Sequence, residues 1–245
     1  MALVSVIIPY YRKKNYIKKT LKSVLDQTFQ DFEIILVYDD PNSDDLIFLK
    51  KITNGNSKIK IIKNSDNLGA GESRNIAMGN SSGEIIAFLD ADDYWLPNRL
   101  EKQLLFMKKN KYKFTFCNYK KKGGNKIIHA ISKKSKITYK DLLTDCEIGL
   151  STVFLSRELI TENLFPPLKT KEDYVAWLKI TKNNIYAYNF PYFLVEWSHS
   201  ENSLSSNFIQ KLSDGFKVYN TYLNFNFLKS VFYLFLLSIN SLKRK

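Results

Sequence analysis

Residues 84–93, EIIAFLDADD, decide the fold class of this 245-residue chain. Residues 85–89 form a short apolar run, which is typical of a buried parallel strand. Three carboxylates follow within four residues, at the point where that strand would end. In open α/β sheets, ligands bind at the carboxyl ends of the strands. The stretch therefore predicts a strand of a parallel sheet with a polar site at its end.

Strand and helix patterns alternate on the amino-terminal side of this stretch. Apolar runs and helical spacing predict, in order, strand 3–8, helix 16–27, strand 32–38, helix 46–52, strand 59–62 and helix 69–79. Pro97 is expected at the first position of a helix that continues through Met107, because proline is favoured there. This alternation predicts an α/β fold with a Rossmann-like, mostly parallel sheet and helices on both faces.

The second half of the chain is less regular. Its expected elements are a strand at 114–119, a lysine-rich hairpin or loop at 120–140, a strand at 149–155, a helix at 156–162 and a helix at 172–180. Residues 225–245 are rich in Phe, Tyr and Leu and end in Lys243-Arg244-Lys245. They predict a terminal helix, either packed on the domain or lying in a membrane interface.

Composition and charge exclude several classes of protein. Apolar residues make up 44% of the chain, which excludes a disordered protein. Cys117 and Cys146 are far apart, which excludes a disulfide scaffold.

The net charge of +13 comes mainly from residues 101–145, which contain 13 lysines and three acidic residues. This block either contacts an anionic partner, such as a membrane surface or a lipid-linked phosphate, or is simply solvated. Nucleic acid is not expected, because the block lacks arginine and no recognised module is present.

The amino terminus has no signal-peptide pattern, and no apolar run reaches the roughly 18 residues of a spanning helix. We therefore expect a cytoplasmic protein, with contact at the inner face of the cytoplasmic membrane as a further option.

The clustered carboxylates of residues 90–93 repel one another unless a cation lies among them. Mg²⁺ or Mn²⁺ suits such an oxygen set. The alternative is that these aspartates favour the start of the next helix.

Six stretches, taken in order and spacing, resemble one enzyme family. They are SVIIPYY (5–11), TLKSVLDQTFQDFEIILVYDD (20–40), NLGAGESRNIAM (67–78), SSGEIIAFLDADDYWLPNRLEKQ (81–103), STVFLSRELI (151–160) and KEDYVAWLKI (171–180). Together they resemble a family 2 glycosyltransferase with the GT-A fold. The resemblance covers about three-quarters of the chain and favours the metal interpretation of the acidic cluster.

The resemblance implies a role for individual residues. It implies a nucleotide-sugar site at Pro9, Tyr10, Tyr11, Asp39, Asp40, Arg74, Asp90, Ala91 and Asp92, and metal ligands at Asp92, Asp93 and His199. Asp39 and Asp40 have the alternative of capping the next helix. Pro41 departs from the family, which often has glycine there. Glu196 and Trp197 also depart from the family's late motif, so only His199 carries over from that motif.

Glu172-Asp173 resembles the family's catalytic-base motif. A nucleoside diphosphate is a weakly basic leaving group, and a metal that neutralises its charge removes the need for a general acid. One carboxylate is then enough to deprotonate the attacking hydroxyl. One base and one metal imply single displacement with inversion. Asp173 is the preferred base and Glu172 its helper; the alternative is that both are ordinary acids of a first helical turn.

We therefore expect a metal-dependent, inverting glycosyltransferase of hexosyl type. It would use a nucleotide-diphosphate sugar and a glycan or lipid-linked glycan acceptor, in cell-surface polysaccharide or lipopolysaccharide synthesis. The expected halves are 1–112 for the nucleotide sugar and 113–224 for acceptor and base, followed by the helix 225–245. The rival functions are a sugar-phosphate nucleotidyltransferase and a non-catalytic basic module that binds membrane or nucleic acid. The nucleotidyltransferase would have a glycine-rich basic loop after the first strand, and residues 9–13 are not one.

Overall fold

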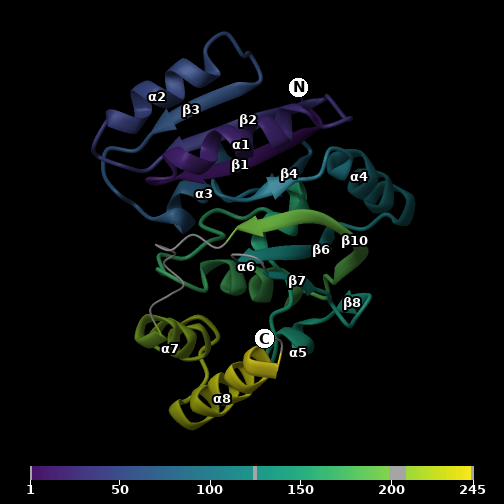
Figure 1. Ribbon diagram of the computed structural model, residues 1–245. Coiled ribbons are helices and arrows are strands. Elements are labelled where there is room, and N and C mark those ends of the chain that lie inside the picture. Colours follow the sequence, from purple (N-terminus) through teal and green to yellow (C-terminus); the bar gives the residue numbers. More distant parts are fainter. Residues whose placement is uncertain (1, 124–125, 199–207, 244–245) are drawn as a thin grey trace.

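A computed structural model describes residues 2–123, 126–198 and 208–243. Strands and helices alternate through the first half of the chain (Figure 1). They are β1 (Val4–Tyr10), α1 (Lys14–Leu25), β2 (Phe32–Tyr38), α2 (Asp44–Thr53), β3 (Ile59–Lys63), α3 (Ala70–Gly79), β4 (Ile85–Phe88), β5 (Tyr94–Trp95) and α4 (Arg99–Asn110). The predicted alternation is confirmed, and the strand predicted at 32–38 has the same bounds as β2.

The second half contributes more strands to the same sheet. Its elements are β6 (Phe114–Gly123), β7 (Lys126–Ala130), β8 (Lys136–Ile137), α5 (Tyr139–Leu142), η1 (Leu150–Thr152), β9 (Phe154–Ser156), η2 (Arg157–Leu159), α6 (Glu172–Thr181), β10 (Ala187–Ser198), α7 (Phe208–Lys217), η4 (Val218–Tyr222) and α8 (Phe227–Lys243). The sheet order is β3-β2-β1-β4-β9-β6-β10-β5, with β7 beside β6 and β8 beside β10.

The four strands β3, β2, β1 and β4 are parallel, so their carboxyl ends lie at one edge of the sheet. The rest of the sheet is mixed. β9 runs antiparallel to both β4 and β6, whereas β6 and β10 are parallel. The Rossmann-like, mostly parallel prediction thus describes the first half, and antiparallel pairing dominates the second.

Helices cover both faces of the sheet, as predicted. Alternate residues of a strand point to opposite faces. Val6 and Ile8 of β1 pack with α1, α2 and α4, while Ile7 packs with α3 and α6. Apolar residues on both faces explain why β1 is a continuous apolar run. These two cores hold the parallel strand ends in a fixed position.

Three local predictions were wrong. Residues 150–152 form the short 3₁₀ turn η1, so the strand predicted at 149–155 is only β9. The helix predicted at 156–162 is reduced to the 3₁₀ turn η2. Pro97 lies before the cap residue Asn98, so it is not the first residue of α4. The lysine-rich hairpin is formed by β6 and β7, and β6 continues well beyond Tyr119.

The predicted terminal helix is α8, which lies beside α7 at one end of the molecule (Figure 1). Its buried side includes Ser230 and Leu237, and Leu237 belongs to the core that surrounds α6. Among the described residues, no helix has the length and apolar character needed to cross a bilayer.

Candidate active site

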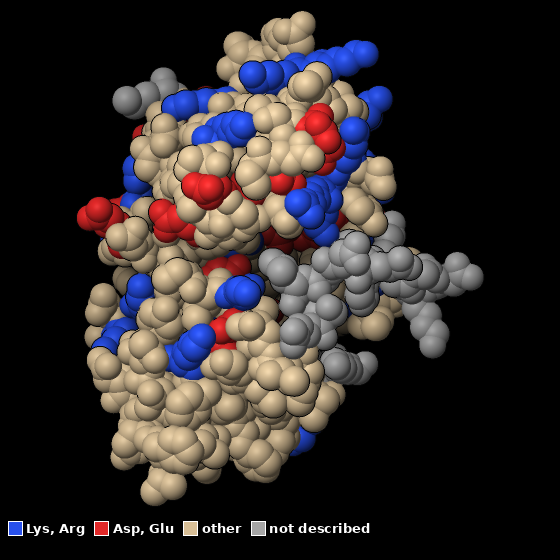
Figure 2. Space-filling view, turned by 90° about the vertical axis from the view of Figure 1, so that its left-hand side faces the viewer, with Lys and Arg blue, Asp and Glu red and all other residues tan. Residues whose placement is uncertain are grey.

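A cavity of about 640 Å³ lies at the carboxyl ends of β1, β2 and β4. Ten of the residues that the sequence singled out line it: Pro9, Tyr10, Tyr11, Asp39, Arg74, Asp90, Ala91, Asp92, Glu172 and Asp173. These residues come from five separate parts of the chain. Parallel strands bring their ends together, and the start of α6 closes the other side. Acidic side chains are visible across the middle of the face shown in Figure 2.

Arg74 connects the two sides of this cavity. Its Nη2 donates to Asp90 Oδ1 at 2.8 Å, and its Nη1 donates to Glu172 Oε1 at 2.7 Å. The Arg74 side chain is only 4% exposed, and its guanidinium packs over the ring of Phe165. Burial lowers the pKa of Arg74, but Asp90 and Glu172 raise it more, so the net shift is upward. One guanidinium therefore holds both carboxylates in place.

The acidic cluster divides into three different environments. Burial raises the pKa of Asp90, against the opposing effect of Arg74. Asp92 borders the cavity and pairs with Lys13 Nζ at 2.7 Å. Asp93 is buried, and its two oxygens accept from Ser151 Oγ and the Ser198 amide. Burial raises the pKa of Asp93 well above its ordinary value. Asp90 is bound to Arg74, and Asp93 is bound to Ser151 and Ser198. Asp92 is thus the carboxylate of the three that lines the larger cavity and takes no part in those buried hydrogen bonds.

Residues at or just after the ends of β1 and β2 contribute in unequal ways. The Tyr10 side chain is fully buried, stacks on Tyr38 and donates to Asp45, so it supports the cavity wall from inside the core. Tyr11 is partly exposed. Asp39 accepts from the Leu68 and Gly69 amides and thereby fixes the loop before α3.

Asp40 is not among the cavity-lining residues. It is buried and pairs with Arg12, which does line the cavity, at 2.8 Å. Its other oxygen accepts from the Asn42 amide, which stabilises the turn before α2. The contacts of Asp40 thus fix the Arg12 side chain and this turn.

The start of α6 brings Glu172 and Asp173 to the cavity. Lys171 precedes the helix in the left-handed conformation, with a φ of 70°. Burial raises the pKa of Glu172 to about 7, although Arg74 acts in the opposite direction. Asp173 Oδ1 accepts from the Tyr174 amide at 2.7 Å. Glu172 is paired with Arg74, whereas no ion pair joins Asp173 to another of the described residues.

A second cavity of about 270 Å³ adjoins the first. Five residues line both cavities: Asp90, Leu150, Lys171, Asp173 and Trp197. The smaller cavity also has Tyr119 and Lys121 in its wall. Asp173 therefore lies where the two cavities meet. This position suits a group that takes a proton from one substrate while it reacts with another.

Sequence analysis missed Lys13, Lys171 and Trp197 as cavity residues. Lys13 is one of 32 lysines and follows no motif, so the sequence carried no signal for it, whereas the place of Lys171 directly before Glu172-Asp173 was an available signal. Trp197 was noted only as a departure from the family pattern. Its place two residues before His199 was the available signal.

The acidic cluster of residues 90–93 fits a divalent cation whose other ligands come from a substrate. All three side chains of the acidic cluster offer oxygen, which Mg²⁺ and Mn²⁺ prefer. Within residues 2–123, 126–198 and 208–243, no group of three or more His, Cys, Asp or Glu side chains could hold a metal alone. Mg²⁺ is commonly held by one or two carboxylates plus substrate phosphates. His199 lies outside the described residues, so its predicted role stays a prediction.

Comparison with known families and curated proteins agrees with this geometry. The sequence model described as glycosyl transferase family 2 matches residues 5–154. UDP-Glc:alpha-D-GlcNAc-diphosphoundecaprenol beta-1,3-glucosyltransferase WfgD of Escherichia coli is 40% identical over 95% of this chain and 90% of its own length. The putative teichuronic acid biosynthesis glycosyltransferase TuaG of Bacillus subtilis is 32% identical over 99% of this chain and 97% of its own length.

Solved structures show the same fold. S. aureus TarS 1–349 in complex with UDP-GlcNAc superposes with a TM-score of 0.76 at 23% identity, over all of this chain and 72% of that one. The mannosyltransferase PcManGT from Pyrobaculum calidifontis, in complex with GDP-Man and Mn²⁺, has a TM-score of 0.70 at 15% identity, over 98% of this chain and 73% of that one. The predicted GT-A fold is confirmed.

Proposed function

The chain belongs to glycosyltransferase family 2, and on that premise we propose that it transfers glucose from UDP-glucose to a lipid-diphosphate-linked GlcNAc, with inversion. Two relatives, WfgD at 40% identity and WfaP of Escherichia coli at 38%, are both named UDP-Glc:alpha-D-GlcNAc-diphosphoundecaprenol beta-1,3-glucosyltransferases. The TuaG relative is named for a different surface polymer, teichuronic acid. These names support a role in the synthesis of a cell-surface glycan.

The position of Asp173 is the observation that carries the proposal. Asp173 lines both cavities, so it can contact an acceptor hydroxyl in the smaller one while the donor occupies the larger one. As a general base it would take the hydroxyl proton on its free carboxylate oxygen as that hydroxyl attacks the anomeric carbon. UDP-glucose is an α-linked donor, so a β-linked product requires attack from the opposite face. A single base at the junction of the two cavities is suited to direct the acceptor hydroxyl at that opposite face.

The larger cavity supports a nucleotide diphosphate sugar. Arg12, Lys13, Lys169 and Lys171 line it together with Arg74, and these cations can offset the charge of a diphosphate. Asp92 is the proposed ligand of Mn²⁺ or Mg²⁺, with Asp93 behind it. When bound, such an ion would neutralise the negative charge that develops on the leaving UDP. Arg74 would keep Asp90 and Glu172 in position throughout.

The smaller cavity supports a sugar acceptor. Trp197 and Tyr119 supply aromatic surface, and Lys121 and Lys171 supply positive charge near it. Sugars offer apolar ring faces that pack on aromatic side chains, and a lipid-linked diphosphate carries negative charge. The cavity therefore suits a GlcNAc residue whose diphosphate extends outward.

The test is transfer from UDP-glucose to a synthetic GlcNAc-diphospho-lipid, with product linkage determined by NMR. We expect a β-linked disaccharide in the presence of Mn²⁺ and little product after chelation. Asp173→Asn should lower kcat by about 10²–10⁴-fold while leaving Mn²⁺-dependent UDP binding unchanged in calorimetry. Asp92→Asn should weaken that UDP binding.

Asp44→Asn is the matched control, because Asp44 is an exposed acid in the first turn of α2. It should retain full activity. Full activity of both Asp173→Asn and Asp92→Asn would overturn the proposed mechanism. Transfer from another nucleotide sugar but not from UDP-glucose would overturn the donor assignment alone.

A further inference from the structure

We propose that α7 and α8 form a face that docks the protein on an anionic lipid bilayer. Nine exposed apolar residues define this docking face: Phe208, Ile209, Leu212, Phe227, Leu228, Val231, Phe232, Phe235 and Leu242. Seven of the nine are more than half exposed. Proteins that remain in water rarely expose so many large apolar side chains together, and such patches mark binding surfaces.

The exposed residues of each helix lie on one side of it. In α8 the spacing of Phe227, Val231, Phe235 and Leu242 is that of a single helical face. Ring contact between Phe216 of α7 and Phe227 of α8, at 5.6 Å between centroids, joins the two helices into one surface. In Figure 2, the lower end of the molecule is largely tan, with few charged side chains.

The charges around the docking face select its partner. Residues 208–243 contain four lysines, Lys211, Lys217, Lys229 and Lys243, and one acid, Asp214. The Asp214 side chain is only 1% exposed, so the exposed charges that α7 and α8 themselves carry are basic. A second copy of this chain would bring lysines against lysines. An anionic leaflet would instead attract each of them.

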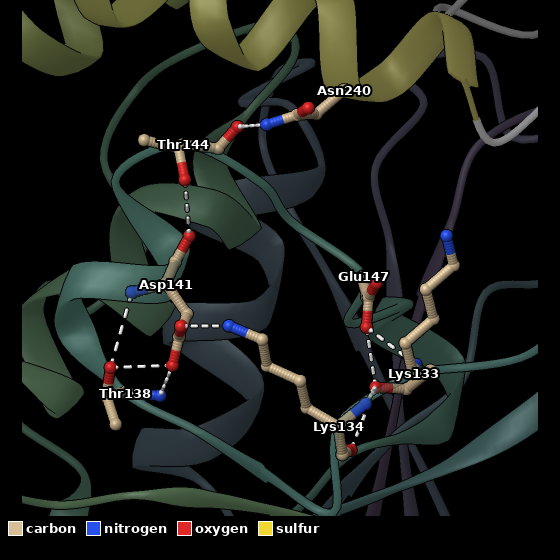
Figure 3. Close-up of polar contacts among 8 residues, drawn as sticks. Lys133, Lys134, Thr138, Asp141, Thr144, Glu147 and Asn240 are labelled. Carbon is tan, nitrogen blue, oxygen red and sulfur yellow. Dashed lines mark hydrogen bonds and ion pairs between the residues drawn. The ribbon is translucent and has the colours of Figure 1, made fainter.

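α8 is fixed to the domain with its apolar side outward. Leu237 is buried in the core. Asn240 Nδ2 donates to the Thr144 carbonyl at 2.9 Å, and Thr144 Oγ1 donates to the Asp141 carbonyl (Figure 3). The docking face of α8 is therefore the side that does not pack on the domain. Since no described helix can span a bilayer, the helices would lie in the plane of its surface.

The docking face is connected to the turn that precedes the proposed base. Asp214 of α7 accepts from both the amide and the hydroxyl of Thr170 at 3.0 Å. Thr170 lies in the turn that lines the larger cavity and leads into Glu172. A bilayer against α7 would thus place lipid-linked acceptors beside the site. This part of the inference rests on the proposed function, whereas bilayer binding itself does not.

The test is co-sedimentation of the purified chain with vesicles. One set contains phosphatidylglycerol and phosphatidylethanolamine, and the other contains phosphatidylcholine alone. We expect binding to the anionic set that weakens as salt rises. The double variant L228Q/F232Q should lower the partition coefficient by about 10-fold or more, because each apolar side chain moved out of water contributes roughly that factor. The control I47Q/L105Q changes two residues that are similarly exposed but lie elsewhere on the surface, and it should bind as the unmodified chain does.

Both double variants should match the unmodified chain in circular dichroism and thermal melting, because all four positions are exposed. Absence of vesicle binding, or equal binding by L228Q/F232Q, would overturn the inference. A dimer in analytical ultracentrifugation that L228Q/F232Q dissociates, without vesicle binding, would overturn it in favour of a second copy. Vesicle binding without any glucosyl transfer would leave the docking face standing and reject the proposed function. Equal transfer by L228Q/F232Q to bilayer-embedded and short-chain acceptors would reject the link between the face and the site.

Discussion

Arg74 Nη1 lies 2.7 Å from Glu172 Oε1, although the two residues are 98 positions apart in the chain. The contact joins α3, which lies between β3 and β4 in the chain, to the first residue of α6. The same guanidinium also holds Asp90 at the end of β4. A planar fork with several donors can do this, whereas a lysine ammonium offers a single point of charge. Arg74 therefore couples the position of the acidic cluster to that of the proposed base.

Arg74→Met should destabilise the fold by up to about 3 kcal/mol, because it leaves two partly buried carboxylates without their counter-charge. Urea denaturation measures this loss. Lys113→Met is the matched control, since it removes a surface pair with Glu158 in which both side chains are about half exposed. That pair should be worth at most about 1 kcal/mol. Equal losses in the two variants would contradict the bridging role of Arg74.

The raised pKa of Glu172 predicts a pH-dependent contribution to stability. Its ordinary value of 4.5 becomes about 7 in the folded chain. The folded state therefore binds more protons than the unfolded state between these values, so the free energy of unfolding falls as pH rises through this window. Glu172→Gln cannot titrate. The stability of the unmodified chain relative to Glu172→Gln should fall by up to about 3 kcal/mol from about pH 5 to about pH 8. Parallel stability curves from urea titrations across that range would contradict the shift.

The parallel half of the fold was predictable because its strands are continuous apolar runs that end in polar residues. The second half was not. Residues 150–152 form η1, where Ser151 accepts from the Asp90 amide and donates to Asp93. The turn is thus held by contacts with a distant segment of the chain, and the local sequence pattern does not predict such contacts. The insertion of β9 between β4 and β6 is likewise a non-local pairing.

The candidate site shows the same division. Residues at strand ends could be grouped because parallel strands end at one edge. The pairing of Lys13 with Asp92 could not be foreseen, because one lysine among many follows no spacing rule. The partner of Glu172 also depends on how α6 packs against α3. Sequence thus predicted many of the residues that line the cavity, and the structure supplied which of them are bound to one another.

Close packing between α3 and α6 predicts different effects for two glycines of one helix. A Cβ added at Gly71 would lie 3.0 Å from the Pro166 carbonyl oxygen and 3.3 Å from Glu172 Cγ, whereas one added at Gly79 meets nothing within 4 Å. Gly71→Ala should cost about 1–3 kcal/mol and reduce kcat/KM, because Glu172 must shift. Gly79→Ala should be neutral or gain up to about 1 kcal/mol. Thermal melts and transfer assays on both variants test this, and similar behaviour of the two would contradict tight α3–α6 packing.

Asp214 should act as a positioning residue for the turn that precedes the proposed base. Its Oδ2 accepts from both the amide and the hydroxyl of Thr170, and it is buried. Asp214→Ala leaves the Thr170 amide without this acceptor, which should cost about 1–3 kcal/mol. We expect kcat to fall more than UDP affinity, because the turn leads into Glu172 and Asp173. Urea denaturation, transfer kinetics and calorimetry measure the three quantities.

Thr170→Val separates positioning by Asp214 from simple loss of stability. It removes the hydroxyl donor and keeps the amide donor, so its effect on kcat should be smaller than that of Asp214→Ala. Asp26→Ala removes a carboxylate that pairs with Lys22 on the surface, and it should change neither kcat nor stability measurably. If Asp214→Ala lowered stability but left kcat unchanged, Asp214 would hold α7 on the domain without orienting the base. If Thr170→Val instead lowered kcat as much as Asp214→Ala, the hydroxyl would be the essential donor and the amide contact dispensable.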